Sequence, residues 1–210
     1  METIVYTDDK SFNWLFDKYY FCGSNSRYWT FQMALNLLFQ RKNSPVIVET
    51  GCQRQEDDLG AGMSTSIFGE YCSRHGGKLY TVDLIETHLN ICRECTSEHS
   101  RNIEYVLSDS VAWLKKAARV NIDLLYLDSL DYPVGSQADD IRMQEAAQVH
   151  CLNEFKAAES SGKLKDNCLI LIDDNQLPGG GKPRLLKQYL KAQGWTCLLD
   201  LQQSLWVRKL

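Results

Sequence analysis

Residues 195–210, WTCLLDLQQSLWVRKL, hold two strand-like segments that are separated only by Gln202 and Gln203. A connection this short can join two strands only as an antiparallel hairpin, because a parallel pair needs a crossover of about a dozen residues or more. A helical segment, PRLLKQYLKAQG (183–194), comes directly before the hairpin. The end of the chain therefore adds an antiparallel element to the sheet that precedes it.

Five more strand-like segments lie upstream of that helix. They are VIVE (46–49), KLYTVDL (78–84), NIEYVLS (102–108), NIDLLYLD (121–128) and NCLILIDD (167–174). Each of the first four is followed by a segment with helical spacing or helix-forming composition. Repeated strand and helix units of this length imply a parallel sheet with helices on both faces. Together with the hairpin, they predict an α/β fold with a seven-stranded, mostly parallel sheet.

The first 44 residues are aromatic-rich and do not follow this alternation. Segment 27–42, RYWTFQMALNLLFQRK, carries apolar residues that share one helical face: Phe31, Leu35, Leu38 and Phe39. We therefore expect a helical lead-in or lid over residues 1–44 and one α/β domain over residues 45–210.

Composition narrows the class of protein. The 210 residues are 44% hydrophobic and 24% charged, which is typical of a globular domain with one core. The net charge of −4 and the absence of a Lys/Arg run argue against a nucleic-acid partner. No apolar run is long enough for a membrane helix, and the N-terminus does not resemble a signal peptide. We expect a cytoplasmic protein whose eight scattered cysteines are reduced thiols.

The loop after the first strand is the first place to seek a ligand, because open α/β sheets bind ligands at the carboxyl ends of their strands. It reads VETGCQRQEDDLGAGMST (48–65). Glu49 closes the strand, and Gly51 lets the backbone approach a ligand closely. Gly62, Ser64 and Thr65 lie at a predicted helix start, whose free N–H groups could bind a carboxylate. The alternative is that these glycines only form a surface turn.

Acidic residues follow the next two strands. Asp83 ends the second strand, where a carboxylate can accept hydrogen bonds from both hydroxyls of a ribose. Asp109 and Ser110 follow the third strand. Each acid alone would be an ordinary helix cap, but their order along three successive strands favours a nucleoside-containing cofactor. A nicotinamide dinucleotide is the alternative cofactor, although its GxGxxG fingerprint is absent.

This arrangement resembles the class I S-adenosylmethionine-dependent methyltransferases, which also have a Rossmann-like sheet that ends with an antiparallel strand. The insertion QRQEDDL (53–59) displaces the later glycines of their first motif. The resemblance implies that S-adenosylmethionine is the cofactor and that Asp109 and Ser110 hold its adenine. The implied cofactor-binding residues are Glu49, Gly51, Gly62, Ser64, Thr65, Asp83, Asp109 and Ser110.

Acidic and amide side chains also follow the fourth and fifth strands. Asp128 ends one, and Asp173, Asp174 and Asn175 end the other. Neighbouring strands lie about 5 Å apart, so one hard cation could bridge them, Mg²⁺ first and Ca²⁺ or Mn²⁺ after it. A polar turn is the alternative. The pattern resembles the metal-dependent O-methyltransferases of the catechol, caffeoyl-CoA and macrolide-sugar types, and it implies Asp128, Asp174 and Asn175 as metal ligands.

The proton acceptor is harder to assign. Asp131 stands where the catechol type carries its basic lysine, so that part of the mechanism does not carry over. His150, in the helix after the fourth strand, is the remaining candidate base, and the other histidines look solvated. The glycine run 179–181 is flexible enough to form a lid element.

The resemblance thus implies metal-assisted O-methylation of a small molecule, and we expect Asp128 and His150 to be the catalytic residues. The alternatives are a metal-independent N- or C-methyltransferase and a non-catalytic adenosylmethionine-binding protein. The lead-in helix and the insertion could instead form a homodimer contact.

Overall fold

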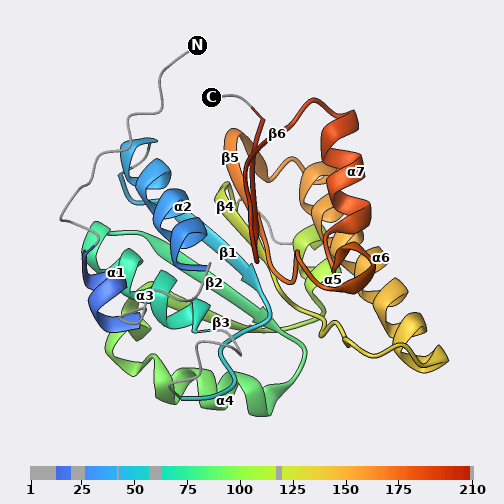
Figure 1. Cartoon of the computed structure of the whole chain (residues 1–210). Helices are drawn as coiled ribbons and strands as arrows, with labels where there is room; N and C mark the ends of the chain where they lie inside the picture. The colour runs from blue at the N-terminus through green and yellow to red at the C-terminus, as the bar shows by residue number, and fades with distance from the viewer. Residues whose placement is uncertain (1–12, 20–26, 42, 57–62, 117–119, 209–210) are drawn as a thin grey trace.

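The computed structural model describes residues 13–19, 27–41, 43–56, 63–116 and 120–208, and it contains one seven-stranded sheet (Figure 1). The strands are β1 (Val46–Thr50), β2 (Lys78–Asp83), β3 (Ile103–Leu107), β4 (Ile122–Leu127), β5 (Leu164–Ile172), β6 (Thr196–Asp200) and β7 (Ser204–Val207). Their order is β3-β2-β1-β4-β5-β7-β6. Strand order reverses between β1 and β4, which places a ligand-binding crevice at their carboxyl ends.

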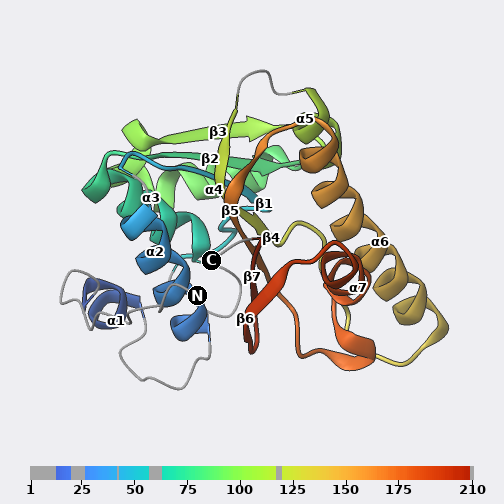
Figure 2. The same cartoon turned by 90° about the horizontal axis from the view of Figure 1, so that it is seen from above.

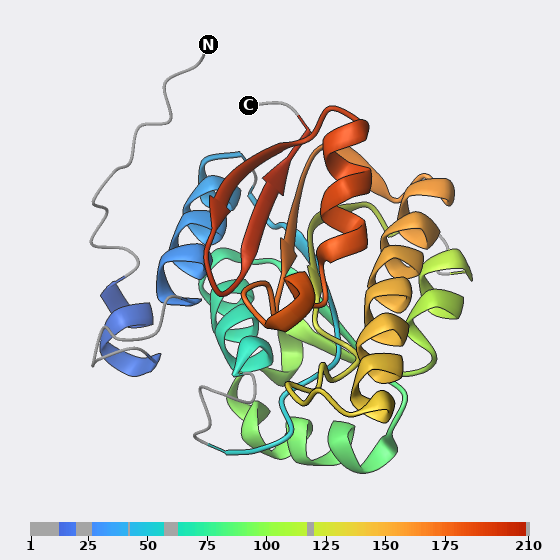
Figure 3. The same cartoon turned by 45° about the vertical axis from the view of Figure 1, so that its right-hand side comes forward.

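The pairing directions confirm the α/β fold and the C-terminal hairpin that the sequence predicts. Strands β1 to β5 pair in parallel, whereas β7 pairs antiparallel with both β5 and β6. In Figure 3 the red hairpin lies alongside the orange strand β5. Strand β5 begins earlier than its apolar run, at Leu164, because its first residues continue past the buried part of the sheet.

Helices cover both faces of the sheet. They are α1 (Asn13–Tyr19), α2 (Arg27–Arg41), α3 (Ser64–His75), α4 (Glu86–Cys95), α5 (Ser110–Lys116), α6 (Ala138–Ser160) and α7 (Arg184–Ala192), with short 3₁₀ turns η2 (Ser97–Asn102) and η3 (Pro178–Gly180). Figure 2 shows α6 and α7 on the opposite side of the central strands from α1 and α2. Among the described helices, none combines the length and apolar character needed to cross a bilayer.

Burial on both faces explains why the central strands read as continuous apolar runs. Successive residues point to opposite faces, so Ile47 joins the core under α2 and α3 while Val48 joins the core under α6 and α7. Leu124 and Leu125 divide in the same way. The two cores therefore share the strands that carry the candidate site.

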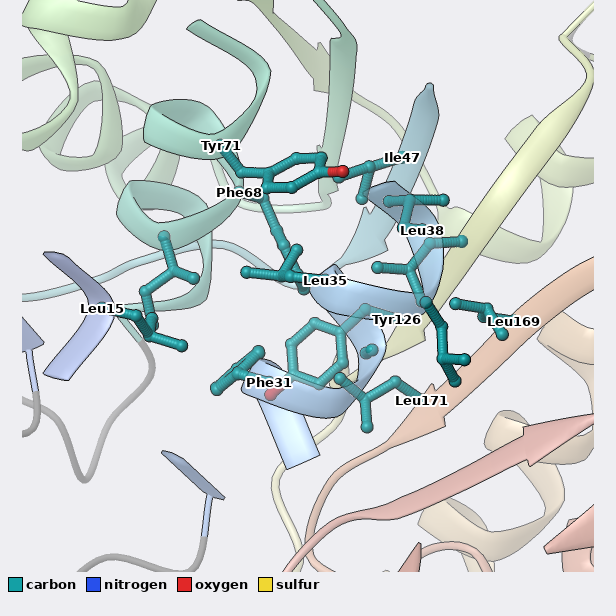
Figure 4. Packing of buried hydrophobic residues seen from close by; sticks show 14 of the residues in the cluster. Leu15, Phe31, Leu35, Leu38, Ile47, Phe68, Tyr71, Tyr126, Leu169 and Leu171 are labelled. Carbon is teal, nitrogen blue, oxygen red and sulfur yellow. The ribbon is translucent and has the colours of Figure 1, made fainter. Parts of the chain in front are cut away.

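The first core is built largely from aromatic and leucine side chains (Figure 4). Phe31 packs with its ring centroid 5.5 Å from that of Phe68 and 5.8 Å from that of Tyr126. Leu35 and Leu38 are also buried, as their spacing predicts. Phe39 differs from the prediction, because it is 40% exposed and packs against the ring of His75 at the edge of the core.

A buried ion pair fixes the start of α2 on the sheet. Arg27 donates to Asp173 from Nε and Nη2, with nitrogen to oxygen distances of 2.9 to 3.1 Å. Tyr126 donates its hydroxyl to the same carboxylate, and Gln203 donates to it at 3.1 Å. Burial would raise the pKa of Asp173, but the charge and hydrogen bonds of Arg27 lower it below its usual value. Asp173 therefore serves as the anchor for α2.

We predict that Arg27→Met lowers the free energy of unfolding by about 3–5 kcal/mol, because the buried carboxylate of Asp173 loses its cation. Denaturant unfolding measures the loss. Arg41→Met, at the exposed end of the same helix, is the matched control and should cost about 1 kcal/mol or less. The double variant Arg27→Met/Asp173→Asn should recover part of the loss; if it is no more stable than Arg27→Met, the unpaired charge is not the cause.

Candidate functional site

A cavity of about 300 Å³ opens at the carboxyl edge of the sheet. The ends of four parallel strands and the loops that follow them supply most of its wall: residues 51–52, 82–85, 108–110 and 128–131. Arg54, Ser64, His88, Met143 and His150 complete the lining. The cavity thus lies where strand order reverses, and its volume is at the small end of the range for ligand pockets.

Gly51 allows the loop after β1 to cross close to the end of β4. Its φ is +83°, and a Cβ at this position would lie 2.5 Å from the carbonyl oxygen of Asp128. The Gly51 N–H donates to the carbonyl of Val82 at 2.8 Å, which also holds the loop against β2. A side chain here would push β1 and β4 apart at the floor of the cavity.

Glu49 supports the cavity from behind and does not line it. Its side chain is fully buried and accepts a hydrogen bond from the hydroxyl of Thr65, which in turn accepts from the backbone N–H of Gln53 at 2.9 Å. Burial raises the pKa of Glu49 to about 7, opposed by the hydrogen bond from Thr65. Ser64, at the start of α3, does line the cavity, whereas Gly62 lies outside the described residues.

Asp83 projects from the end of β2 into the cavity. Its Oδ1 accepts the N–H of Ile85 at 2.8 Å and lies 3.4 Å from Nδ1 of His88. The thiol of Cys52 lies 3.4 Å from Oδ2. These contacts hold the carboxylate at the wall of the cavity.

Asp109 and Ser110 stand at the next strand end along the sheet, and both line the cavity. Asp109 accepts the N–H of Ala112 at 2.7 Å, so it also caps α5, which is the structural role that the sequence left open. The Ser110 hydroxyl lies 3.2 Å from Nε2 of His150. The structure therefore brings His150 next to the two residues predicted to hold adenine.

His150 also lies beside an acidic partner on its own helix. Its Nε2 is 3.3 Å from Glu154, and that contact raises the pKa of His150 although burial opposes it. Sequence reasoning missed His88 as a cavity residue. The expectation that the other histidines are solvated is wrong for His88 and His99, whose side chains are only 26% and 14% exposed.

Asp128 and Asp174 meet at the ends of β4 and β5, but a lysine lies between them. The Nζ of Lys182 is 2.7 Å from Oδ1 of Asp128 and 3.1 Å from Oδ2 of Asp174. The lysine side chain is 2% exposed, whereas Asp128 is 26% exposed and lines the cavity. Burial would lower the pKa of Lys182, but the two carboxylates raise it above its usual value. Lys182 is therefore a fixed positive charge.

Asn175, the third predicted metal ligand, faces other partners. Its amide nitrogen donates to Asp200 and to the carbonyl of Leu201, both at 2.6 Å, and its amide oxygen accepts from Lys187 at 2.9 Å. Within the described parts of the chain, no cluster of three His, Cys, Asp or Glu side chains is arranged to hold a metal. The oxygens of Asp128, Asp174 and Asn175 thus do not converge on one open position.

Arg54 and Asp131 form an ion pair at the mouth of the cavity, with nitrogen to oxygen distances of 2.9 and 3.1 Å. Asp83, Asp109, Asp128 and Asp131 give the lining four carboxylates. Two of them already have cationic partners, in Lys182 and Arg54. The remaining acids, Asp83 and Asp109, add carboxylate oxygens to the lining that could accept hydrogen bonds from a ligand.

Comparison with known proteins identifies the fold. No protein-family model and no curated protein matches the sequence. Among solved structures, the chain is similar to an rRNA methylase from Streptococcus thermophilus, with 13% identity over 84% of this chain and 93% of that one and a TM-score of 0.54. It is also similar to a proposed caffeoyl-CoA O-methyltransferase from Staphylococcus aureus, with 12% identity, coverages of 86% and 83% and a TM-score of 0.54.

A third similar structure is a methyltransferase of the mycinamycin biosynthetic pathway, in complex with Mg, S-adenosylhomocysteine and mycinamycin VI. Identity is 16% over 93% of this chain and 53% of that one, and the TM-score is 0.60. These likenesses, together with the sheet order, show that the chain has the Rossmann-like methyltransferase fold.

We predict that Glu49→Gln stabilises the protein increasingly as pH rises. The raised pKa of Glu49 means that the folded state holds its proton more tightly than the unfolded state, so this contribution to stability is lost between pH 4.5 and about 7. Glutamine does not titrate, so its advantage over wild type should grow by on the order of 3 kcal/mol across that window. Unfolding curves at pH 5 and pH 8 measure it.

Glu104→Gln, at an exposed position on β3, reports the effect of removing a surface carboxylate. A difference between Glu49→Gln and wild type that is the same at both pH values would contradict the desolvation of Glu49.

Proposed function

We propose that this protein transfers a methyl group from S-adenosylmethionine to a small acceptor. The proposal rests on one observation: Gly51, Asp83, Asp109, Ser110 and Asp128 all line the same cavity. These residues come from the ends of β1 to β4 in the order in which a nucleoside-containing cofactor would meet them. The methyltransferase fold of the solved structures that resemble this chain supports the same cofactor.

The charge of the cavity supports a sulfonium cofactor over a dinucleotide. S-adenosylmethionine carries a positive sulfur and an ammonium group, whereas a nicotinamide dinucleotide carries two phosphates. Asp83 could bind the ribose of either cofactor, but a diphosphate also needs cationic or N–H donors. Arg54 is the only arginine or lysine in the described lining, and it is already paired with Asp131.

The residues of the cavity divide by the part of the cofactor that each would hold. Asp83 would accept the ribose hydroxyls, and Ser110 with Asp109 would bind the adenine. Ser64, at the start of α3, and the close backbone at Gly51 would hold the methionine portion. When bound, the cofactor supplies an electrophilic methyl group on a positively charged sulfur.

Asp128 is the group best placed to act on the acceptor. It lies at the floor of the cavity, next to the Gly51 loop, and its partly exposed carboxylate can accept the proton that the acceptor loses. His150 would act from the side of Ser110, near the adenine, so it is less well placed for this step. Leu130 and Met143 give the mouth of the cavity an apolar edge that a small organic acceptor could contact.

The arrangement favours a metal-independent transfer over the metal-assisted O-methylation that the resemblance implies. A divalent ion would need the oxygens of Asp128 and Asp174 that now accept from Lys182. It would also bring two positive charges against that buried ammonium group. The residues present therefore do not fit the ion in this arrangement.

A small acceptor fits the surface charge better than a nucleic acid does. One of the similar structures is an rRNA methylase, but this chain has a net charge of −4 and an acidic cavity, which repel a phosphate backbone. The cytoplasmic location stays a prediction from the sequence.

Calorimetric titration with S-adenosylhomocysteine, the product, tests cofactor binding. We expect micromolar binding by the wild-type protein and a loss of about 10- to 150-fold in Asp83→Ala, since hydrogen bonds to a carboxylate contribute about 1.5–3 kcal/mol. Asp139→Ala, an exposed aspartate on α6 outside the cavity, is the matched control and should bind as wild type does. If the folded wild-type protein does not bind S-adenosylhomocysteine, a nicotinamide dinucleotide becomes the favoured cofactor.

Transfer of labelled methyl groups to a pool of small hydroxyl and amine compounds tests the subtype. We predict the same rate in EDTA as in buffer with Mg²⁺, because Lys182 and not an added ion balances Asp128. A rate that collapses on chelation and returns with Mg²⁺ would support the metal-assisted O-methyltransferase instead.

A further inference from the structure

The ammonium group of Lys182 lies between Asp128 and Asp174, in the place that a metal ion bridging these two carboxylates would occupy. Its ammonium nitrogen lies within 3.1 Å of a carboxylate oxygen on each of two neighbouring strand ends, from Asp128 and Asp174. The side chain is almost completely buried, so these contacts are not those of a mobile surface lysine. The position of the amine therefore depends on how the loop after β5 is folded.

Four residues of that loop have a positive φ, and two of them set the position of the lysine. Asp174 has a φ of +54°, which is uncommon for a residue with a side chain. Gly181 has a φ of +64°, and a Cβ there would lie 1.9 Å from the carbonyl oxygen of Asp174. The same carbonyl accepts the backbone N–H of Lys182 at 3.3 Å. Only glycine at 181 lets the chain return closely enough to place Lys182 between the acids.

Two other segments hold the loop from outside. The side-chain amide of Gln148, on α6, donates to the carbonyl of Gly181 at 3.2 Å. The hydroxyl of Tyr132 donates to the carbonyl of Pro178 at 2.7 Å. The glycine run that the sequence suggests as a lid is thus hydrogen-bonded in place, and these bonds stabilise the position of the lysine.

Two cations from the chain, Arg27 and Lys182, contact all three carboxylates at the two strand ends. Arg27 pairs with Asp173, and Lys182 pairs with both Asp128 and Asp174. Buried carboxylates as close as these require cations, and both cations here come from the chain itself. A divalent ion could enter only if Lys182 left, which the backbone contacts of residues 178–182 oppose.

We propose that Lys182 is the built-in cation of this site: its ammonium group bridges Asp128 and Asp174, directs the Asp128 carboxylate into the cavity and closes the site to divalent metals. Lys182 is a positioning residue, because it acts on the acceptor through Asp128. That role toward the acceptor rests on the proposed methyl transfer, whereas the exclusion of metals rests on the geometry of the strand ends alone.

Binding of Mn²⁺, followed by electron paramagnetic resonance, tests the proposal without any need for activity. The wild-type protein should bind no Mn²⁺ at this site. Lys182→Met removes the amine and leaves two facing carboxylates, so it should gain one bound ion per chain, at least about tenfold tighter than any binding by wild type. Lys182→Met/Asp174→Asn should lose the gained ion. Lys187→Met, which removes a lysine from the neighbouring Asn175 and Asp200, is the matched control and should gain none.

Two results would overturn the proposal. One is stoichiometric Mn²⁺ binding by wild type that Asp174→Asn abolishes; the other is a folded Lys182→Met protein that binds no ion. The wild-type titration decides the matter even if Lys182→Met does not fold. Titration of the wild-type protein with S-adenosylhomocysteine separates the two proposals. If the wild-type protein does not bind it, the proposed function is contradicted, but the Mn²⁺ result still stands.

Discussion

The candidate site depends on one constraint: cations must offset the negative charges of the carboxylates at the ends of β4 and β5. Parallel strands bring their carboxyl ends to one edge, and here that edge carries Asp128, Asp173 and Asp174. Ionised carboxylates this close together are stable only when cations are brought to them. Arg27 and Lys182 supply the positive charges from segments far apart in the sequence. The edge is therefore complete only when the start of α2 and the loop after β5 are both in place.

The ion pair of Arg27 also connects the core to the candidate site. Helix α2 packs Phe31 against Tyr126, while the Tyr126 hydroxyl donates to Asp173 and lies 3.3 Å from Asp128. The same side chain thus belongs to the apolar core through its ring and to the polar edge through its oxygen. Packing under α2 sets where Asp173 lies, and that carboxylate is one of the charges acting on Asp128. Tyr126 therefore contributes both to the packing of the core and to the position of the carboxylates at the candidate site.

The fold could be read from the sequence because its signals are local, whereas part of the site could not. Apolar runs with both faces covered mark β1 to β5, and the short Gln202-Gln203 connection marks the hairpin. The acids after β2 and β3 were found because strand ends share one edge. Lys182 was missed because its place depends on the left-handed backbone at Asp174 and Gly181, and no periodic pattern reports that. Phe39 was misplaced because its side chain lies at the edge of the core, where it packs against His75 and stays 40% exposed.

A lysine and a divalent ion solve the same electrostatic problem, but they leave different chemistry available. An ion keeps open coordination positions and can bind an acceptor oxygen directly. The Lys182 ammonium group is buried and directs its protons to Asp128 and Asp174, so it holds the carboxylates without reaching the cavity. The group that does reach the cavity is Asp128. Under the proposed function, catalysis then relies on the position of one carboxylate next to the methyl donor, and the residues that fix the loop 178–182 become part of what determines the reaction.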